Sequence, residues 1–297
     1  MKNSQGKKAE NSIKPGTIFQ LGDHRLACGD CTNPNLLSAL IGKDKVSLIS
    51  TDPPYGVAYV ESKLGFSESI NHKVIANDQF QSDKAYTGFT KEWLEAIKLY
   101  FATKNSVYIF NSDKKIFALR EGIIQAGYHF AQLLIWVKSQ AVVGRLDYLP
   151  QHELIAYGWY GRHSFKKSKD KSILFCPKPE KNILHPTMKP ISLLRRLILN
   201  STDIGEYVFD GFSGSGSTLI ACEHVKRKCL AVELDPEYCQ VIMDRFEKLT
   251  GIKPKLLTQL TDEKGQNYKT AKGTKRGNNS KPRKDSNYPS YMRKTWH

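Results

Sequence analysis

Cysteine is scarce in this chain of 297 residues, which has six, spread from Cys28 to Cys239. Cysteines that are so few and so scattered exclude a disulfide scaffold, and we expect reduced thiols. Cys28 and Cys31 form a C-x-x-C pair, the spacing of half a zinc site or of a redox pair. Because neither a second such pair nor a histidine pair follows at zinc spacing, we assign no metal to the chain.

The sequence also lacks a long apolar run and a signal peptide, since residues 1–11 are polar throughout. These absences favour a soluble, cytoplasmic protein with no membrane partner. Acidic residues are few as well, because 29 Asp and Glu stand against 45 Lys and Arg, for a formal net charge of +16. A positive field of this size attracts polyanions, so nucleic acid is the leading class of partner.

Apolar β-rich runs alternate with helical patterns, which predicts an α/β fold with a mostly parallel sheet covered by helices on both faces. A β-hairpin is predicted within Thr17–Cys28. The other predicted strands are Val46–Thr51, Ser106–Phe110, Leu133–Val137, Glu206–Asp210 and Cys229–Leu234. The predicted helices are Glu92–Phe101, Lys114–Ala126, Ile191–Asn200, Ser217–Val225 and Glu237–Leu249. We therefore expect one domain over residues 15–252, with a flexible N-terminal tail over residues 1–14.

Residues 253–297 differ in composition from the rest of the chain, with twelve Lys and Arg against three acids. Four aromatic residues are interleaved with the basic ones: Tyr268, Tyr288, Tyr291 and Trp296. This segment is not expected to pack a core. Stacking and phosphate contacts on a nucleic acid fit the composition, and so does a disordered, solvated tail with no specific role.

A glycine-rich turn follows the apolar strand that ends at Asp210. Its residues, which lead into a helix, are Phe212, Ser213, Gly214, Ser215, Gly216, Ser217 and Thr218. A phosphate-binding loop needs lysine where Ser217 stands, and a dinucleotide fingerprint needs glycine where Leu219 stands, so both are disfavoured. Glu233 ends the next strand, 19 residues after Gly214, at the spacing of a carboxylate that binds ribose hydroxyls. A nucleoside without an obligatory pyrophosphate is indicated, and S-adenosylmethionine meets that description.

A second motif, Asp52-Pro53-Pro54-Tyr55, ends the strand Val46–Thr51. Prolines donate no ladder hydrogen bond, so the chain must leave the sheet there as a stiff turn, at a strand end where ligands bind in open α/β sheets. The Asp52 carboxylate and the Pro53 carbonyl can accept both hydrogens of an exocyclic amine while Tyr55 stacks on the base. The motif thus predicts amine recognition, and the structural alternative is a buried acid that caps a proline turn.

Three motifs carry a resemblance to a known group: Asp52–Tyr55, His185–Pro190 and Asp210–Gly216, in this chain order. They resemble the amino-methyltransferases of bacteria and phages in the β-group arrangement, which places the catalytic half before the cofactor half. The stretch Leu21–Asp30 also resembles a segment found in many phage and mobile-element members, and the likeness covers about residues 15–249. It implies a Rossmann-like S-adenosylmethionine-dependent methyltransferase fold with permuted motif order and one antiparallel strand in the sheet.

By this resemblance, Asp52, Pro53, Pro54 and Tyr55 are the catalytic residues, and Phe212 and its neighbours form the turn over the methionine end of the cofactor. Asp210 would meet the amino group of the cofactor, Glu233 its ribose and Asp30 its adenine. The cofactor pocket would be closed by the stretch that contains His185, Thr187 and Lys189. Gly211 departs from the pattern, because members commonly carry proline there.

The resemblance further implies transfer of a methyl group from S-adenosylmethionine to a flipped-out base of double-stranded DNA, in the setting of restriction-modification. Asp52 in the first motif position favours N6 of adenine, and N4 of cytosine is the alternative. A non-catalytic nucleic-acid-binding protein and an RNA or protein methyltransferase are further alternatives, and a homodimer is compatible with the resemblance. Target recognition is expected in an insert at about residues 139–184, with Gly56–Phe89 as a mobile loop near the base.

Overall fold

The computed structural model describes residues 13–56, 81–141, 147–166, 169–177 and 188–261. The strands in these residues are β1 (Thr17–Leu21), β2 (His24–Cys28), β3 (Val46–Thr51), β4 (Phe101–Asn111), β5 (His129–Val137), β6 (His152–Trp159), β7 (Arg162–His163), β8 (Ile173–Phe175), β9 (Tyr207–Asp210), β10 (Lys228–Glu233) and β11 (Lys255–Gln259). The helices are α1 (Pro34–Ile41), α2 (Asp83–Ile97), the 3-10 turn η2 (Lys98–Tyr100), α3 (Ile116–Gln125), α4 (Ile191–Ser201), α5 (Ser217–His224) and α6 (Pro236–Thr250). None of these helices is long and apolar enough to span a bilayer.

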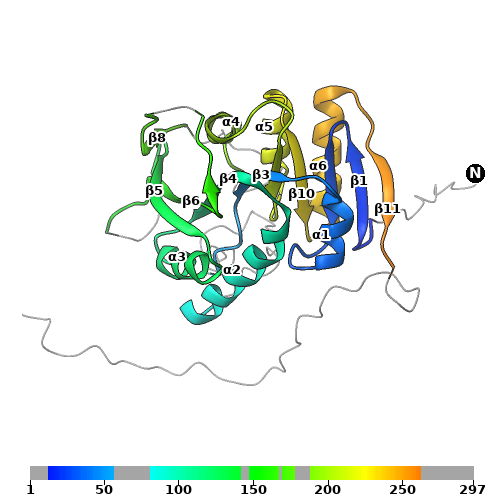
Figure 1. Ribbon diagram of the computed structural model, residues 1–297. Coiled ribbons are helices and arrows are strands. Elements are labelled where there is room, and N and C mark those ends of the chain that lie inside the picture. Colours follow the sequence, from blue (N-terminus) through cyan, green and yellow to red (C-terminus); the bar gives the residue numbers. More distant parts are fainter. Residues whose placement is uncertain (1–12, 57–80, 142–146, 167–168, 178–187, 262–297) are drawn as a thin grey trace, which may run out of the picture.

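One twisted sheet organises the fold, in the strand order β11-β1-β2-β10-β9-β3-β4-β6-β5-β8, with β7 paired to β4 (Figure 1). Strands β2, β10, β9, β3 and β4 are mutually parallel. Every residue of β3 is buried, as expected for a central parallel strand with both faces covered. The predicted parallel α/β sheet is therefore confirmed.

Helices cover both faces of the sheet, and each face has its own apolar core (Figure 1). One core joins Leu194 of α4, Ile220 of α5 and Phe246 of α6 to the sheet. The other joins Leu37 of α1 and Trp93 of α2 to the opposite face, together with α3. These three layers hold the strand ends at fixed positions, on which a site at the sheet edge depends.

The direction of the crossovers reverses between β3 and β9. From β3 the chain passes through α2 to β4 on one side, and from β9 it passes through α5 to β10 on the other side. Open α/β sheets bind ligands at the carboxyl ends of the strands beside such a reversal. The two motifs of the sequence analysis follow β3 and β9 directly, so the topology brings them together.

Two strands, β1 and β6, run antiparallel to the others, where one such strand was expected. Strand β6 comes from the segment expected to form the recognition insert, but it pairs with β4 and β5 within the sheet, and its residues Ile155 and Ala156 are buried. The hairpin of β1 and β2 accounts for the second antiparallel strand.

The domain also extends beyond residue 252, the expected boundary. Strand β11 pairs antiparallel with β1, and the Leu260 N–H donates to the carbonyl of Gly16. All five side chains of β11 are exposed, so the strand adds hydrogen bonds at the sheet edge and little apolar core. Because β11 contributes so little to the core, its short sequence did not predict that it belongs to the domain and not to the basic segment that follows.

Helix α2 starts nine residues before the predicted start at Glu92, within the stretch expected to be a mobile loop. Ser82 caps it by accepting a hydrogen bond from the Ala85 N–H, and Tyr86 on its first turns is buried. The helix gives way to a 3-10 turn after Ile97, so the predicted end at Phe101 is wrong too. Residues 57–80 of the expected loop lie outside the described residues.

Candidate active site

A cavity of about 860 Å³ opens at the carboxyl ends of β3, β9 and β10. The predicted site residues that line it are Asp30, Asp52, Pro53, Pro54, Tyr55, Lys189, Asp210, Phe212, Ser213, Gly214, Ser215, Ser217, Thr218 and Glu233. Its volume lies in the range of ligand pockets for molecules of drug size. One cavity therefore holds both motifs, although some 160 residues of sequence separate them.

The glycine-rich turn is held at one end of the cavity by its own hydrogen bonds. The Asp210 carboxylate accepts from Thr51 Oγ1 at 2.7 Å and from the Phe212 N–H at 3.3 Å. Gly216 has φ of +78°, and a Cβ there would lie 2.9 Å from the Ile242 side chain. Only glycine satisfies both conditions, which explains its place at the start of α5 even though it does not line the cavity itself.

Glu233 fastens the turn from the neighbouring strand. Its Oε2 accepts from the Gly214 N–H at 2.7 Å, and its Oε1 accepts from the Asp235 N–H at 2.9 Å. Asp30 lies nearby, because the Gly29 N–H donates to the Glu233 carbonyl oxygen at 2.8 Å, and its own carboxylate accepts from the backbone and side chain of Thr32. Three carboxylates thus converge on the end of the cavity that the turn forms.

Burial raises the pKa of two of these carboxyl groups, that of Asp210 to about 6 and that of Glu233 to about 7. Each keeps backbone or hydroxyl donors that oppose this rise. In the absence of a ligand, burial makes these two carboxyl groups costly to ionise. A cationic ligand or one that donates hydroxyl hydrogen bonds stabilises their ionised form. Ser217 adds a buried hydroxyl, with no hydrogen-bond partner among the described residues, to the cavity wall. These carboxylate acceptors and the Ser217 hydroxyl fit S-adenosylmethionine, which carries an ammonium, a sulfonium and ribose hydroxyls.

Aromatic packing fixes the side wall at the same end. The Phe212 ring lies 5.7 Å from Phe89 and 5.6 Å from Trp93, both on α2. Arg245 of α6 donates to the Ser215 carbonyl oxygen behind the turn. Thr218 donates to the Ser50 carbonyl oxygen at 3.5 Å and so ties α5 to β3. The turn is therefore rigid, as a preformed binding loop requires.

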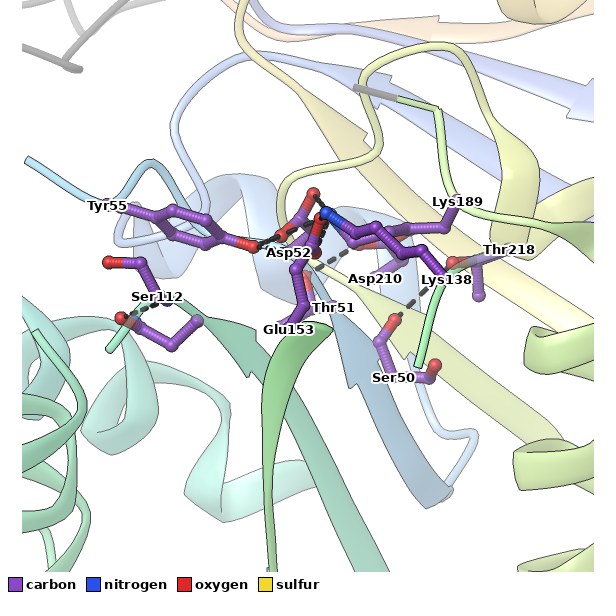
Figure 2. Close-up of polar contacts among 11 residues, drawn as sticks. Ser50, Thr51, Asp52, Tyr55, Ser112, Lys138, Glu153, Lys189, Asp210 and Thr218 are labelled. Carbon is purple, nitrogen blue, oxygen red and sulfur yellow. Dashed lines mark hydrogen bonds and ion pairs between the residues drawn. The ribbon is translucent and has the colours of Figure 1, made fainter. Parts of the chain in front are cut away.

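The motif that follows β3 forms the other end of the cavity, and Figure 2 shows its polar contacts. The Tyr55 hydroxyl donates to Asp52 Oδ1 at 2.7 Å. The Lys189 ammonium donates to Asp52 Oδ2 at 2.5 Å. Burial raises the pKa of Asp52, and the negative charge of Glu153 adds to this, while Lys189 acts against it. A carboxylate with both oxygens engaged thus stands at the cavity wall beside Pro53.

Lys189 lies at this carboxylate, whereas the resemblance to amino-methyltransferases implied a place among the residues that close the cofactor pocket. Besides Asp52, its ammonium contacts Glu153 Oε2 at 3.1 Å. Glu153 in turn binds Lys138 at 2.8 Å. A buried ammonium needs carboxylate partners, and here Asp52 and Glu153 of β6 supply them. His185 and Thr187, the other two residues of that stretch, lie outside the described residues.

Sequence reasoning missed Glu153 and Lys138, which both line the cavity. Glu153 is the last residue of a short polar stretch, Gln151–Glu153, that leads into β6, and nothing in its spacing marks it as a site residue. The available signal was an acid at the start of β6 opposite a lysine just after the end of β5. That signal can be recognised only if the pairing of the two strands is known.

Cys28 and Cys31 are both buried, and Cys31 lines the cavity. Burial raises the pKa of the Cys31 thiol well above its usual value, and the neighbouring Asp30 adds to this. A thiol in this state is a poor nucleophile and a poor metal ligand. Among the residues that the structure describes, no cluster of three or more His, Cys, Asp or Glu could hold a metal ion.

Sequence comparison finds relatives among bacterial DNA-modifying enzymes. The family model of N6/N4 DNA methylases matches residues 46–244. The type II methyltransferase M.HpaI of Haemophilus parainfluenzae is 26 % identical over 254 residues, which cover 76 % of this chain and 74 % of that protein. The type II methyltransferase M2.DpnII of Streptococcus pneumoniae is 25 % identical over 227 residues, 69 % of this chain and 83 % of that protein.

Solved structures share the fold. The complex of M1.HpyAVI with S-adenosylmethionine superposes with a TM-score of 0.55 at 22 % identity and covers 74 % of this chain and 98 % of that one. The PvuII DNA methyltransferase, described as cytosine-N4-specific, has a TM-score of 0.59 at 17 % identity over 80 % of this chain and 93 % of that one. The family match includes both motifs of the cavity, and the chain therefore belongs to the N6/N4 DNA methylases, which are S-adenosylmethionine-dependent DNA methyltransferases.

Proposed function

We propose that this enzyme methylates N6 of adenine in double-stranded DNA, with Asp52 as the residue that receives the target amine. The observation that carries the proposal is the position of Asp52 and Pro53 in one cavity with the glycine-rich turn. A carboxylate and a proline carbonyl at one strand end can accept both hydrogens of an exocyclic amine. Aspartate in the first position of the motif favours adenine, by the resemblance to amino-methyltransferases described above.

S-adenosylmethionine supplies a methyl group on a positively charged sulfur. The residues of the chain position the other reactant. Two acceptors that hold both N–H groups direct the lone pair of the amine away from the ring plane and toward the methyl group. Asp52 stabilises the positive charge that develops on the nitrogen, and its Oδ1 accepts the proton that the methylated amine must lose. Alignment of two bound reactants supplies much of the acceleration, so no covalent enzyme intermediate is required.

A base inside a duplex cannot reach this cavity, so the target nucleotide must be flipped out, at a cost of a few kcal/mol. Stacking on the Tyr55 ring would offset part of this cost. Target recognition belongs in our proposal to the parts of residues 139–184 that flank β6. Tyr148, in one of these parts, is 92 % exposed and lines the cavity, so the segment adjoins the proposed base pocket.

N4 of cytosine is the second candidate product, because the PvuII enzyme described as cytosine-N4-specific shares the fold. At 17 % identity this likeness bears on the fold alone. An exocyclic amine on either base presents the same two N–H groups, so the choice depends on the shape of the pocket around the ring.

Nucleoside mass spectrometry tests the product. We expect the full chain, incubated with S-adenosylmethionine carrying a labelled methyl group, to form N6-methyldeoxyadenosine in duplex DNA that was copied in vitro and is free of methylation. The Asp52→Ala chain is the control. Labelled N4-methyldeoxycytidine would overturn the choice of base, and label in RNA alone would overturn the choice of polymer.

The basic segment after β11 lies outside the described residues, and its proposed role is phosphate contact. Residues 262–297 contain ten Lys and Arg against three acids. Truncation after Thr261 keeps β11 and is expected to weaken DNA binding without changing the methylated sequence. Each lost phosphate contact lowers the slope of log affinity against log salt by about 0.9, so loss of three flattens it by ~2.7. An unchanged salt slope would show that the segment does not touch DNA, and altered site choice would show that it reads bases.

A further inference from the structure

Four charged side chains meet at the base end of the cavity, and each comes from a different part of the chain (Figure 2). Asp52 follows β3, Glu153 belongs to β6, Lys138 follows β5 and Lys189 precedes α4. We propose that Glu153 is a positioning residue for methyl transfer: it holds Lys189 on Asp52 Oδ2 and so leaves Oδ1 to receive the target amine. The proposal rests on the role proposed above for Asp52 and is independent of which base is methylated.

The Lys189 ammonium is held by three acceptors. It lies 2.5 Å from Asp52 Oδ2, 3.1 Å from Glu153 Oε2 and 3.4 Å from the Tyr55 hydroxyl. Its side chain is 8 % exposed, and its ammonium lies 5.2 Å from the centre of the Phe110 ring. An ammonium has three N–H donors, so this buried group is satisfied in one orientation. Removal of either carboxylate leaves it short of a partner.

The second lysine fixes Glu153 in the same way. Lys138, also 8 % exposed, binds Glu153 Oε1 at 2.8 Å, while Oε2 faces Lys189. Burial raises the pKa of Glu153, but the two ammonium groups outweigh burial, and the net effect is a lowered pKa. Glu153 therefore stays ionised, with one oxygen on each lysine.

The two oxygens of Asp52 have different partners as a result. Oδ2 carries the charge-assisted bond to Lys189, and Oδ1 carries the bond from the neutral Tyr55 hydroxyl. Charge-assisted hydrogen bonds are roughly twice as strong as neutral ones. An incoming amine thus displaces the Tyr55 hydroxyl from Oδ1 more readily than it displaces Lys189 from Oδ2.

Charge balance gives Glu153 a second effect. Positive charge develops on the amine nitrogen during transfer, and the negative charge of Asp52 stabilises it. If Lys189 were the only charged neighbour of Asp52, its ammonium would neutralise that negative charge. Glu153 binds Lys189 and thereby reduces the pull of the ammonium on Asp52. The groups that act on the ionisation of Asp52 are Lys189, Glu153 and Tyr55, together with Asp210 at the end of the neighbouring strand β9. Glu153 disfavours ionisation of Asp52 and Lys189 favours it.

The test compares Glu153→Gln with Lys189→Met in the full-length enzyme, with labelled methyl transfer to DNA as the readout. Glutamine keeps the shape and an acceptor oxygen, so the fold should persist. We expect kcat of Glu153→Gln to fall about 10- to 100-fold, the scale of a reacting group displaced by about 1 Å. The dissociation constant of S-adenosylmethionine should stay unchanged, because the glycine-rich turn is untouched.

The pH profiles separate positioning from a structural role. The acid limb of kcat should move to lower pH in Glu153→Gln, because a negative charge beside Asp52 is lost, and to higher pH in Lys189→Met, because a positive charge is lost. Glu121→Gln on α3 is the matched control, and its profile should equal that of the original enzyme. The proposal is overturned if Glu153→Gln has the same kcat and the same acid limb as the original enzyme. It is also overturned if the acid limbs of Glu153→Gln and Lys189→Met move in the same direction.

Two further results keep the test decisive. If Glu153→Gln does not fold, Lys138→Met is used, since Lys138 forms an ion pair with Glu153, whereas the ion pair of Asp52 is with Lys189. A fall in kcat at unchanged cofactor affinity is again expected, and an unchanged kcat overturns the proposal. Mass spectrometry of the product from the original enzyme shows separately whether the base is adenine, so an error in the choice of base does not affect this test.

Discussion

Substitution of Asp52 by alanine is expected to abolish measurable methyl transfer, a loss of about 1000-fold, the upper end of the scale for removal of a preorganised group at a developing charge. Binding of S-adenosylmethionine should stay within a few fold of the original affinity. The reason is spatial: Asp52 contacts Tyr55 and Lys189, whereas the carboxylates proposed for the cofactor lie at the glycine-rich turn. Calorimetry of cofactor binding and single-turnover transfer to DNA measure the two effects separately.

Two further variants are controls for the Asp52→Ala result. Asp52→Asn keeps an oxygen for Lys189 and should be as inactive as the alanine variant, because the amide cannot take up a proton. Asp244→Ala removes an exposed acid on α6, outside the residues that line the cavity, and should be fully active. Parallel loss of cofactor binding in the Asp52 variants would place Asp52 in the cofactor site and sink our assignment.

Substitution of Glu233 by alanine is expected to weaken the binding of S-adenosylmethionine by about 1.5–3 kcal/mol, or roughly 10- to 150-fold, the range for hydrogen bonds to a charged group. Glu233 both faces the cavity and holds the Gly214 N–H, so alanine removes a ligand contact and loosens the turn. Isothermal titration calorimetry measures the change. An unchanged affinity would place the nucleoside elsewhere in the cavity.

The pH dependence of cofactor binding follows from the same residue. Because burial raises the pKa of Glu233 to about 7, the free enzyme holds a proton there below neutral pH. The protonated carboxyl is a weaker acceptor for ribose hydroxyls, so affinity should rise as the pH increases through 7. Glu233→Gln should remove this step and leave only the dependence from Asp210, whose pKa of about 6 lies lower. A pH profile that is the same in both proteins would contradict the role of Glu233.

Much of the fold was readable in the sequence because local patterns and tertiary structure agree there. Strand β3 is buried throughout and has an apolar centre at Leu48 and Ile49, and it ends just before Asp52 and two prolines that cannot continue a ladder. The turn after β9 needs glycine at Gly216 for its positive φ, and a carboxylate ends the next strand. Each of these signals depends on a few neighbouring residues, so a single sequence is sufficient to reveal it.

Elements that depend on distant partners were missed or misplaced. Strand β6 has a place in the sheet only because β4 and β5 flank it. The exposed strand β11 is defined by its hydrogen bonds to β1, which lies at the other end of the chain. Neither has an apolar pattern that predicts its neighbour.

By itself, the sequence determined the two motifs of the cavity, their chain order and the parallel sheet that carries them. Only the tertiary structure decided that Lys189 lies on Asp52, and that Glu153 and Lys138 complete this charged cluster. The physical reason is that the ends of β3 and β5 and the starts of β6 and α4 converge at one edge of the sheet. The ion pairs among these buried groups depend on that convergence in space, and they cannot be predicted from the spacing of the residues in the sequence.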